Sequence, residues 1–280
     1  TVLTNEQGGI IDDLMVNHAG DEAWYLVINA GCKHKDMDWM KQHIPAGLEC
    51  TYFADWSLLA LQGPKAEEVL KAVVGMDASD MPYMSMRPHG DLYISRLGYT
   101  GEDGFEIAVH NDAAPALWDK LLANPAVKPI GLAARDSLRL EMGYALYGHD
   151  IDDKTSPVEA SMNWVLGKTR TGYFGSARIQ KELAEGPAKK FVGIKLIGAG
   201  VAREGSEIRN GSDQNVGVLT SGGFSPTLKA SIGQGYVSPD LAAPGTKLFV
   251  NVRGKNIEAE VCALPHVQAR TKSAKKKEAA

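Results

Sequence analysis

The sequence predicts an α+β N-terminal region followed by a smaller all-β C-terminal domain. Up to about residue 170, apolar strand patterns alternate with amphipathic helical patterns, as is typical of a mixed fold. After Gly186 and Pro187, short β-rich segments alternate with turns rich in Gly, Pro, Asn and Asp. This change in the sequence pattern predicts a second domain built as a barrel or a sandwich.

The first predicted elements are a hairpin and a helix. Two apolar strands, 10–16 and 23–29, flank the polar loop NHAGDE. Apolar runs on both sides of a polar turn are the usual signal of a hairpin. Residues 33–43 follow with helical spacing, and Met37 and Trp39 are available to pack that helix.

Further mixed elements continue the N-terminal region. A strand, a Gly-Pro break and a helix are predicted within 58–75, a hairpin over 91–110, and helices over 114–123 and 131–141. The C-terminal β segments are FVGIKLI, EIRN, NVGVLTS, GQGYVS, KLFVNVR and IEAEVCA, all after residue 190.

Composition excludes several classes of function. The chain has 280 residues and a net charge of −4, so no overall basic field draws it to nucleic acid. No apolar run is long enough to span a membrane, so membrane insertion is not expected. The three cysteines are widely spaced and odd in number, which favours free thiols in a reducing compartment.

Common catalytic motifs are also missing. The sequence has no CxxC, HExxH, Walker A or GxSxG motif, and its seven histidines have no ligand spacing, so no metal site is predicted. The stretch GAGVAREG at 198–205 only superficially matches a dinucleotide loop, because Arg203 replaces the third glycine.

Two motifs indicate a small-molecule site. GYTGEDGFE at 98–106 places Glu106 in an apolar strand, and GLAARDSLRLE at 131–141 places Arg135 and Arg139 one helical turn apart. Buried charges are costly unless they bind something polar. The pattern therefore suggests recognition of a polar, planar ligand. The alternative is that all three side chains face solvent.

Further candidates lie outside these motifs. Asp12 and Asp13 are adjacent in a strand and face opposite sides, so one of them is expected to point inward beside a ligand. Alternatively, both lie solvated on an edge strand. Tyr99 and Trp164 could stack on a ligand or simply pack in the core.

A series of long motifs, in this order, resembles the aminomethyltransferase of the glycine cleavage system, the T-protein. They are TNEQGGIIDDL, YLVINAG, LALQGP, GYTGEDGFE, GLAARDSLRLE, LYGHDID, SPVEASMNWVLGK and TSGGFSPTLKASIGQGYV. The resemblance extends over residues 1–265. It implies a folate-binding aminomethyltransferase region at 1–185 and a β-barrel domain at 186–266. The remaining residues, 267–280, end in the small and basic stretch TKSAKKKEAA, a composition that predicts a disordered tail.

The resemblance also implies an activity. Members of this family use tetrahydrofolate to accept the aminomethyl carbon from the lipoyl arm of the H-protein. They release 5,10-methylenetetrahydrofolate and ammonia. The implied partners are tetrahydrofolate and lipoylated H-protein. Lys168 and Arg170 are candidates for meeting an acidic carrier, and the alternative is that they are ordinary solvated charges. The implied location is the mitochondrial matrix in a eukaryote and the cytoplasm in a bacterium.

The family's site residues carry over onto matching motifs. Asp13 matches the catalytic carboxylate beside the folate nitrogens, and the folate-binding positions are Asn29, Tyr99, Glu106, Arg135 and Trp164. A simple hairpin register places Asn29 on the face of Asp12. A loop longer or shorter by one residue reverses the faces, and the resemblance favours Asp13.

Two departures from the family leave alternatives open. Members carry a further segment before the TNE motif that this sequence does not include, so a fragment, an incomplete sequence or a shortened paralogue is expected. The LPHVQAR ending also diverges. A degenerate, non-catalytic subunit of a larger complex is therefore the alternative function. Folate domains of oxidases and an iron–sulfur assembly factor are related, but no flavin domain or KGC motif is present.

Overall fold

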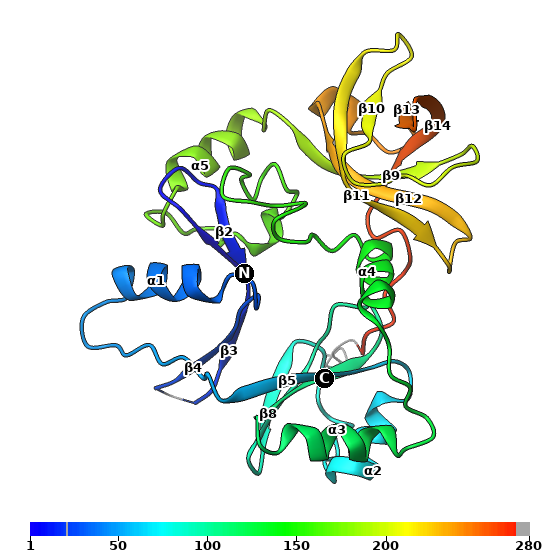
Figure 1. Ribbon diagram of the computed structural model, residues 1–280. Helices are drawn as coiled ribbons and strands as arrows, with labels where there is room; N and C mark the ends of the chain where they lie inside the picture. The colour runs from blue at the N-terminus through cyan, green and yellow to red at the C-terminus, as the bar shows by residue number, and fades with distance from the viewer. Residues whose placement is uncertain (21, 273–280) are drawn as a thin grey trace, which may run out of the picture. The chain divides into compact units, whose positions relative to one another are not determined.

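The computed structural model describes residues 1–20 and 22–272, and the chain divides into two compact units (Figure 1). The first unit contains Thr1–Val16, Leu26–Leu48 and Ser137–Val267. The second contains Asn17–Tyr25, Glu49–Asp136 and the chain from Gln268 onward.

A four-stranded antiparallel sheet forms the centre of the second unit, with strand order β5-β8-β7-β6. The strands are β5 (Trp56–Gln62), β6 (Ser85–His89), β7 (Leu92–Arg96) and β8 (Gly104–His110). The predicted hairpin at 91–110 is confirmed, because Tyr93 of β7 pairs with Ala108 of β8.

Helix α2 (Ala66–Val74) follows β5 after the predicted Gly-Pro break. Gly63 has a φ of +124°, which only glycine adopts easily, and lets the chain leave the strand. Ala66, Val69 and Leu70 are buried at helical spacing and pack against the sheet core around Phe105. Each fully buried side chain of the size of Leu70 contributes roughly 1.5–3 kcal/mol. Helix α3 (Ala114–Leu122) also lies in this unit.

The first unit begins with the antiparallel strands β1 (Val2–Thr4) and β2 (Ile10–Asp13). The single strand expected over 10–16 is two strands, because the pairing partner changes at Leu14. Beyond Leu14, β3 (Met15–His18) and β4 (Trp24–Val27) form the expected hairpin in a separate two-stranded sheet, of which Asn17–Tyr25 belong to the second unit. The first unit also contains helices α1 (Lys33–His43) and α5 (Ser176–Glu185) and the last part of α4 (Leu132–Glu141). Helix α4 crosses from the second unit into the first.

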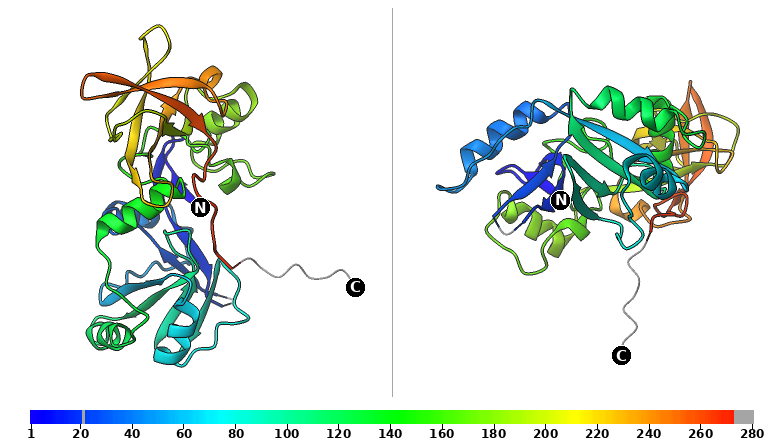
Figure 2. Two further views of the ribbon diagram at one scale, coloured as in Figure 1. Left: turned by 90° about the vertical axis from the view of Figure 1, so that its right-hand side faces the viewer. Right: turned by 90° about the horizontal axis from the view of Figure 1, so that it is seen from below.

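The C-terminal strands close into a six-stranded barrel, as predicted, in the order β10-β11-β12-β9-β14-β13. They are β9 (Lys190–Leu196), β10 (Glu207–Arg209), β11 (Asn215–Ser225), β12 (Ala230–Val237), β13 (Lys247–Val252) and β14 (Lys255–Cys262). Ile194, Leu219 and Val250 are fully buried in its core. Figure 2 shows these strands, coloured from yellow-green to orange, curving into the barrel.

The start of the predicted tail makes defined contacts within the second unit. The backbone N–H of Arg270 donates to the Gly101 carbonyl at 2.7 Å, and the N–H of Tyr83 donates to the Lys272 carbonyl at 3.0 Å. The Lys272 ammonium lies 2.9 Å from the Glu67 carboxylate. The rest of the predicted tail, 273–280, lies outside the described residues. Within the described part of the chain, no helix is long and apolar enough to cross a membrane.

Candidate functional site

In the first unit, Asn29 joins the two adjacent aspartates of β2. Its side-chain nitrogen Nδ2 donates to Oδ1 of Asp12 at 2.9 Å and to Oδ1 of Asp13 at 2.9 Å. Its backbone N–H also donates to Oδ2 of Asp12 at 3.1 Å. The question of which aspartate Asn29 faces therefore has a simple answer, because one amide reaches both carboxylates.

The two glycines before β2, Gly8 and Gly9, fix the position of this strand. A Cβ on Gly9 would lie 1.8 Å from the carbonyl oxygen of Asp153, so no larger residue fits there. The N–H of the next residue, Ile10, donates to the carbonyls of Asp152 and Thr155 at 3.1 and 3.0 Å. Ile10 is fully buried. This close backbone approach anchors the strand from which both aspartates project.

The two aspartates differ in exposure. Asp12 is fully buried and is the inward-facing aspartate that the strand pattern predicts, whereas Asp13 is half-buried. Burial raises the pKa of Asp13, the charge of Asp12 raises it further, and the hydrogen bond from Asn29 lowers it. A carboxylate in these surroundings interacts strongly with a developing positive charge or with an N–H donor.

Helix α1 supplies residues around this cluster that the sequence analysis missed. The Lys35 ammonium donates to the Ile11 carbonyl and, at 2.6 Å, to the Tyr147 hydroxyl. Asp36 is fully buried. One feature of the sequence could have drawn attention to Asp36. It follows Cys32 by four residues, which is about one helical turn, so the two side chains lie on the same face, and both are buried. A carboxylate on the buried stripe of a helix is unusual.

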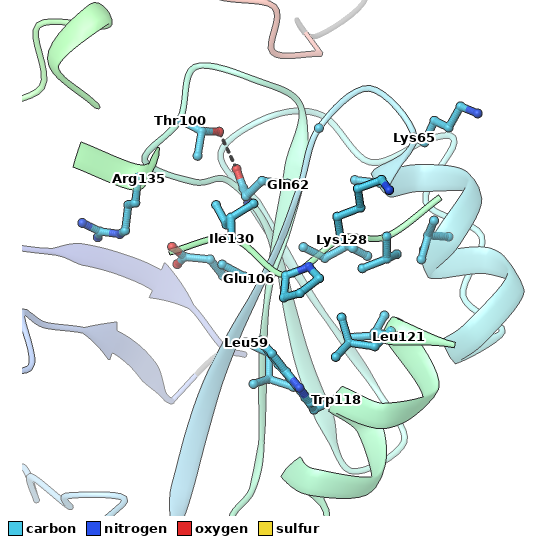
Figure 3. Close-up of a pocket in the computed structure, with 18 of the residues that line it drawn as sticks. Leu59, Gln62, Lys65, Thr100, Glu106, Trp118, Leu121, Lys128, Ile130 and Arg135 are labelled. Atoms are coloured by element: carbon cyan, nitrogen blue, oxygen red, sulfur yellow. Dashed lines mark hydrogen bonds between the residues drawn. The ribbon is translucent and has the colours of Figure 1, made fainter. Parts of the chain in front are cut away.

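In the second unit, a cavity of about 510 Å³ is lined by three of the predicted folate-binding residues, Tyr99, Glu106 and Arg135. Figure 3 labels Glu106 and Arg135. Apolar side chains such as Leu59 and Leu121 form much of its wall. Figure 3 shows Glu106 and Arg135 reaching toward one end of the cavity, away from Trp118 and Leu121. The cavity thus combines an apolar wall with a charged end, as is common for sites that bind ring systems.

Glu106 lies on β8 between Ala60 of β5 and Ser95 of β7. Burial raises the pKa of Glu106, and the positive charge of Arg135 partly opposes that effect. Within 1–20 and 22–272, no N–H or O–H donates to this carboxylate. An ionised Glu106 therefore has two acceptor oxygens available for a ligand with paired N–H groups.

The Gly-rich turn brings the remaining polar groups together. The guanidinium carbon of Arg135 lies 4.4 Å from the centre of the Tyr99 ring, a cation–π contact. Gln62 accepts a hydrogen bond from the Thr100 hydroxyl at 2.9 Å and donates to the Leu97 carbonyl at 3.0 Å. A Cβ on Gly98 would lie 2.0 Å from the Gln62 side chain, which explains the glycine in this turn.

The prediction that Arg135 and Arg139 together bind a ligand is wrong for Arg139. Its guanidinium is buried in the first unit and forms an ion pair with Asp150 at 2.9 Å. Asp150 also accepts hydrogen bonds from the hydroxyl of Ser221 and the side-chain amide of Gln234, both at 2.9 Å. Arg139 is therefore part of a structural network. Helical spacing alone could not distinguish it from Arg135.

Trp164 lies in a short 3₁₀ helix (Asn163–Val165) of the first unit. Its side chain is 74% exposed. Among the described residues it makes no ring contact. Its role in folate binding stays a prediction.

Comparison with known proteins identifies two family domains in this chain, the first of which includes segments of both compact units. Residues 1–170 match the model of the GCVT N-terminal domain, and residues 189–268 match that of the glycine cleavage T-protein C-terminal barrel domain. The mitochondrial aminomethyltransferase of Flaveria trinervia is 44% identical over 282 residues, which cover 95% of this chain and 69% of that protein. The aminomethyltransferase of Phocaeicola vulgatus is 40% identical, covering 95% of this chain and 76% of its own.

A solved structure gives the same result. The crystal structure of the glycine cleavage system aminomethyltransferase T from Bartonella henselae superposes with a TM-score of 0.92 at 38% identity. The match covers 97% of this chain and 76% of that one. With both domain models matched and sequence identity extending over nearly the whole chain, this protein belongs to the glycine cleavage T-protein family.

Proposed function

We propose that this chain is an aminomethyltransferase that transfers the aminomethyl carbon from lipoylated H-protein to tetrahydrofolate. The products are 5,10-methylenetetrahydrofolate, ammonia and the reduced lipoyl arm. The observation that carries the proposal is the Asp13 carboxylate, held by Asn29 at 2.9 Å, in a chain of the aminomethyltransferase family. No observation favours the non-catalytic alternative.

The proposed role of the cavity in the second unit is to hold the pterin ring of tetrahydrofolate. The Glu106 carboxylate would accept hydrogen bonds from the 2-amino group and the neighbouring ring N–H. The face of Tyr99 and the apolar wall that includes Leu59 would contact the flat ring. Arg135, stacked over Tyr99, would keep Glu106 ionised as an acceptor.

The reaction exchanges two bonds of the transferred carbon. One folate nitrogen replaces the sulfur of the lipoyl arm, and the other replaces the amino nitrogen. The two protons lost from the folate nitrogens end on the thiol and on ammonia, so no oxidant or reductant is needed. The proposed role of Asp13 is to orient the attacking nitrogen and to stabilise the positive charge that develops on it.

The proposed partner is a lipoylated H-protein, with exposed Lys168 and Arg170 as candidate contacts. The mitochondrial and bacterial relatives lead us to propose the mitochondrial matrix for a eukaryotic source and the cytoplasm for a bacterial one.

The test is turnover of the purified chain with aminomethyl-loaded H-protein and tetrahydrofolate, with calorimetric titration of tetrahydrofolate alongside. We expect methylenetetrahydrofolate and ammonia to form in equal amounts. Folate binding without turnover on any lipoyl carrier would reject the catalytic proposal. The absence of folate binding would reject the assignment of the cavity.

A further inference from the structure

Asp36 of helix α1 is fully buried, yet neither of its carboxylate oxygens has a hydrogen-bond donor among the described residues. An ionised carboxylate left in this state would be very unstable, because burial removes its water without replacing the lost hydrogen bonds. Native structures rarely retain such a group. The side chain must therefore be stabilised in another way.

The neighbours of Asp36 argue against a negative charge on it. Asp12 and Asp13 face it from β2, and Lys35 of α1 and Cys32, just before the helix, lie beside it. The single ammonium of Lys35 is hydrogen-bonded to Ile11 and Tyr147. Lys35 is therefore the cation that acts on Asp36, whereas the Thr1 ammonium acts on Asp13.

The Asp12 carboxylate can provide the hydrogen-bond partner that Asp36 lacks. Asp12 accepts two hydrogen bonds from Asn29 and is also hydrogen-bonded by the Cys32 thiol. Two carboxylate oxygens can accept more than three hydrogen bonds. A protonated Asp36 could therefore donate its O–H to Asp12. Burial raises the pKa of Asp36 to about 8, and a hydrogen bond of this kind and the charge of Asp12 both act in the same direction.

The start of helix α1 opposes this arrangement only weakly. Asp36 lies in the first turn, where the helix dipole favours an ionised carboxylate. That effect is small beside full burial and two neighbouring negative charges. The neutral acid is therefore the dominant form at neutral pH.

We propose that Asp36 is a positioning residue: as a neutral acid it donates a hydrogen bond to Asp12, and Asp12 with Asn29 holds the Asp13 carboxylate in place. The hydrogen bond is a property of the fold, whereas its effect on turnover rests on the proposed aminomethyl transfer. Loss of the Asp36 proton would place a third negative charge in the cluster and disturb Asp13.

The pH dependence has a defined sign. The pKa of Asp36 rises from 3.8 to about 8 in the folded protein, so folding favours its protonated form. The resulting stabilisation is complete below pH 3.8 and is lost as the pH rises through about 8. Turnover that depends on Asp36 should decline over the upper part of the same range.

The experiment compares three variants of the full chain. Asp36→Asn keeps a neutral hydrogen-bond donor in the same shape, whereas Asp36→Leu removes the donor. Asp38→Asn, at an exposed position of the same helix, is the matched control. Carbon-13 spectra of the aspartate carboxyl groups across pH, together with kcat and KM at each pH, give independent readings.

A carboxyl resonance that titrates near pH 8 in the parent and in Asp38→Asn, but is missing from Asp36→Asn, supports the proposal. At pH 7 we expect kcat to stay within about threefold in Asp36→Asn. In Asp36→Leu we expect a fall of about tenfold or more with KM for folate little changed. The alkaline decline should disappear in Asp36→Asn.

The proposal is overturned if every aspartate titrates below about pH 5. It is also overturned if Asp36→Asn loses as much turnover as a folded Asp36→Leu, or if Asp36→Leu turns over normally. If Asp36→Leu does not fold, the carbon-13 titration and the pH profile of Asp36→Asn still decide whether the proposal stands. If the parent chain has no turnover, the proposed function fails, while the titration still tests the Asp36–Asp12 hydrogen bond.

Discussion

The side-chain nitrogen of Asn29 lies 2.9 Å from a carboxylate oxygen of Asp12 and 2.9 Å from one of Asp13. One amide therefore joins two neighbouring carboxylates that strand geometry directs to opposite faces. Buried Asp12 fixes the amide, and the amide in turn fixes half-buried Asp13. This chain of contacts is the basis of the first prediction.

Replacing Asp13 with Asn should reduce turnover with little effect on folding. The substitution keeps the shape but removes the charge, so we expect kcat to fall at least about tenfold, or about 1.4 kcal/mol of barrier. Because burial raises the pKa of Asp13, its charge does not stabilise the fold near neutral pH. Turnover and urea denaturation of both proteins provide the check. Turnover equal to that of the parent would remove Asp13 from the mechanism.

Glu106→Gln should weaken folate binding. The amide replaces one of the two acceptor oxygens with a donor, which leaves one pterin N–H facing another donor. Losing a charged hydrogen bond costs about 1.5–3 kcal/mol, so the folate Kd should rise about tenfold or more. Calorimetric titration gives the Kd, and Glu68→Gln at an exposed position of α2 is the control. An equal Kd for the parent and Glu106→Gln would give Glu106 a structural role only.

His266 should make the protein less stable at acidic pH. Its Nε2–H donates to the Gly233 carbonyl at 3.1 Å, and its Nδ1 lies 3.3 Å from the Cys262 sulfur, which suits a neutral ring. Burial lowers the pKa of His266 from 6.5 to about 4. As the pH falls, His266 therefore takes up a proton in the unfolded state before it does so in the folded state. The stability present above pH 6.5 is lost as the pH falls toward 4.

Denaturation curves across this pH range, for the parent and His266→Gln, test the prediction. The variant should lose less stability on acidification, and His34→Gln at an exposed position should match the parent. Parallel pH profiles for the parent and His266→Gln would contradict the expected role of His266.

Exposed Lys168 and Arg170 should contribute to docking of an acidic carrier protein. Salt screens charges at the edge of an interface, so KM for loaded H-protein should rise with ionic strength. Replacing both residues with Gln should raise KM about twofold or more at low salt and flatten its salt dependence. Lys255→Gln, exposed on the barrel, is the control. A KM that is flat with salt in the parent would reject the electrostatic contribution.

Much of the fold could be predicted because its signals are local. The helix at 33–43 has the predicted bounds, and Gly63 with Pro64 separates β5 from α2 as expected. The short C-terminal strands follow from apolar runs separated by turn residues, but that pattern fits a barrel or a sandwich, and only the family resemblance favoured the barrel that the structure shows. The split of the strand at 10–16 was missed because it depends on which strands pair on either side of Leu14. That is a long-range property.

The candidate site was less predictable for the same reason. Helical spacing places Arg135 and Arg139 on one face, but only the fold pairs Arg139 with Asp150. Alternation along β2 correctly indicates one inward aspartate, yet it cannot reveal an amide that bonds to both. Asp36 was missed because its significance depends on Asp12, which lies on a separate element.

The second unit draws on three separate stretches of sequence, the last beginning at Gln268. The Arg270 and Lys272 backbones complete hydrogen bonds to Gly101 and Tyr83, which are encoded far upstream. During synthesis, therefore, this unit cannot be finished until the whole barrel has left the ribosome. Contacts of such wide sequence separation slow folding because a long loop must close first. The hydrogen bonds of Arg270 and Lys272 in the second unit thus depend on chain that is made after the barrel of the first unit. The two units therefore cannot be expressed separately by cutting the gene at one position.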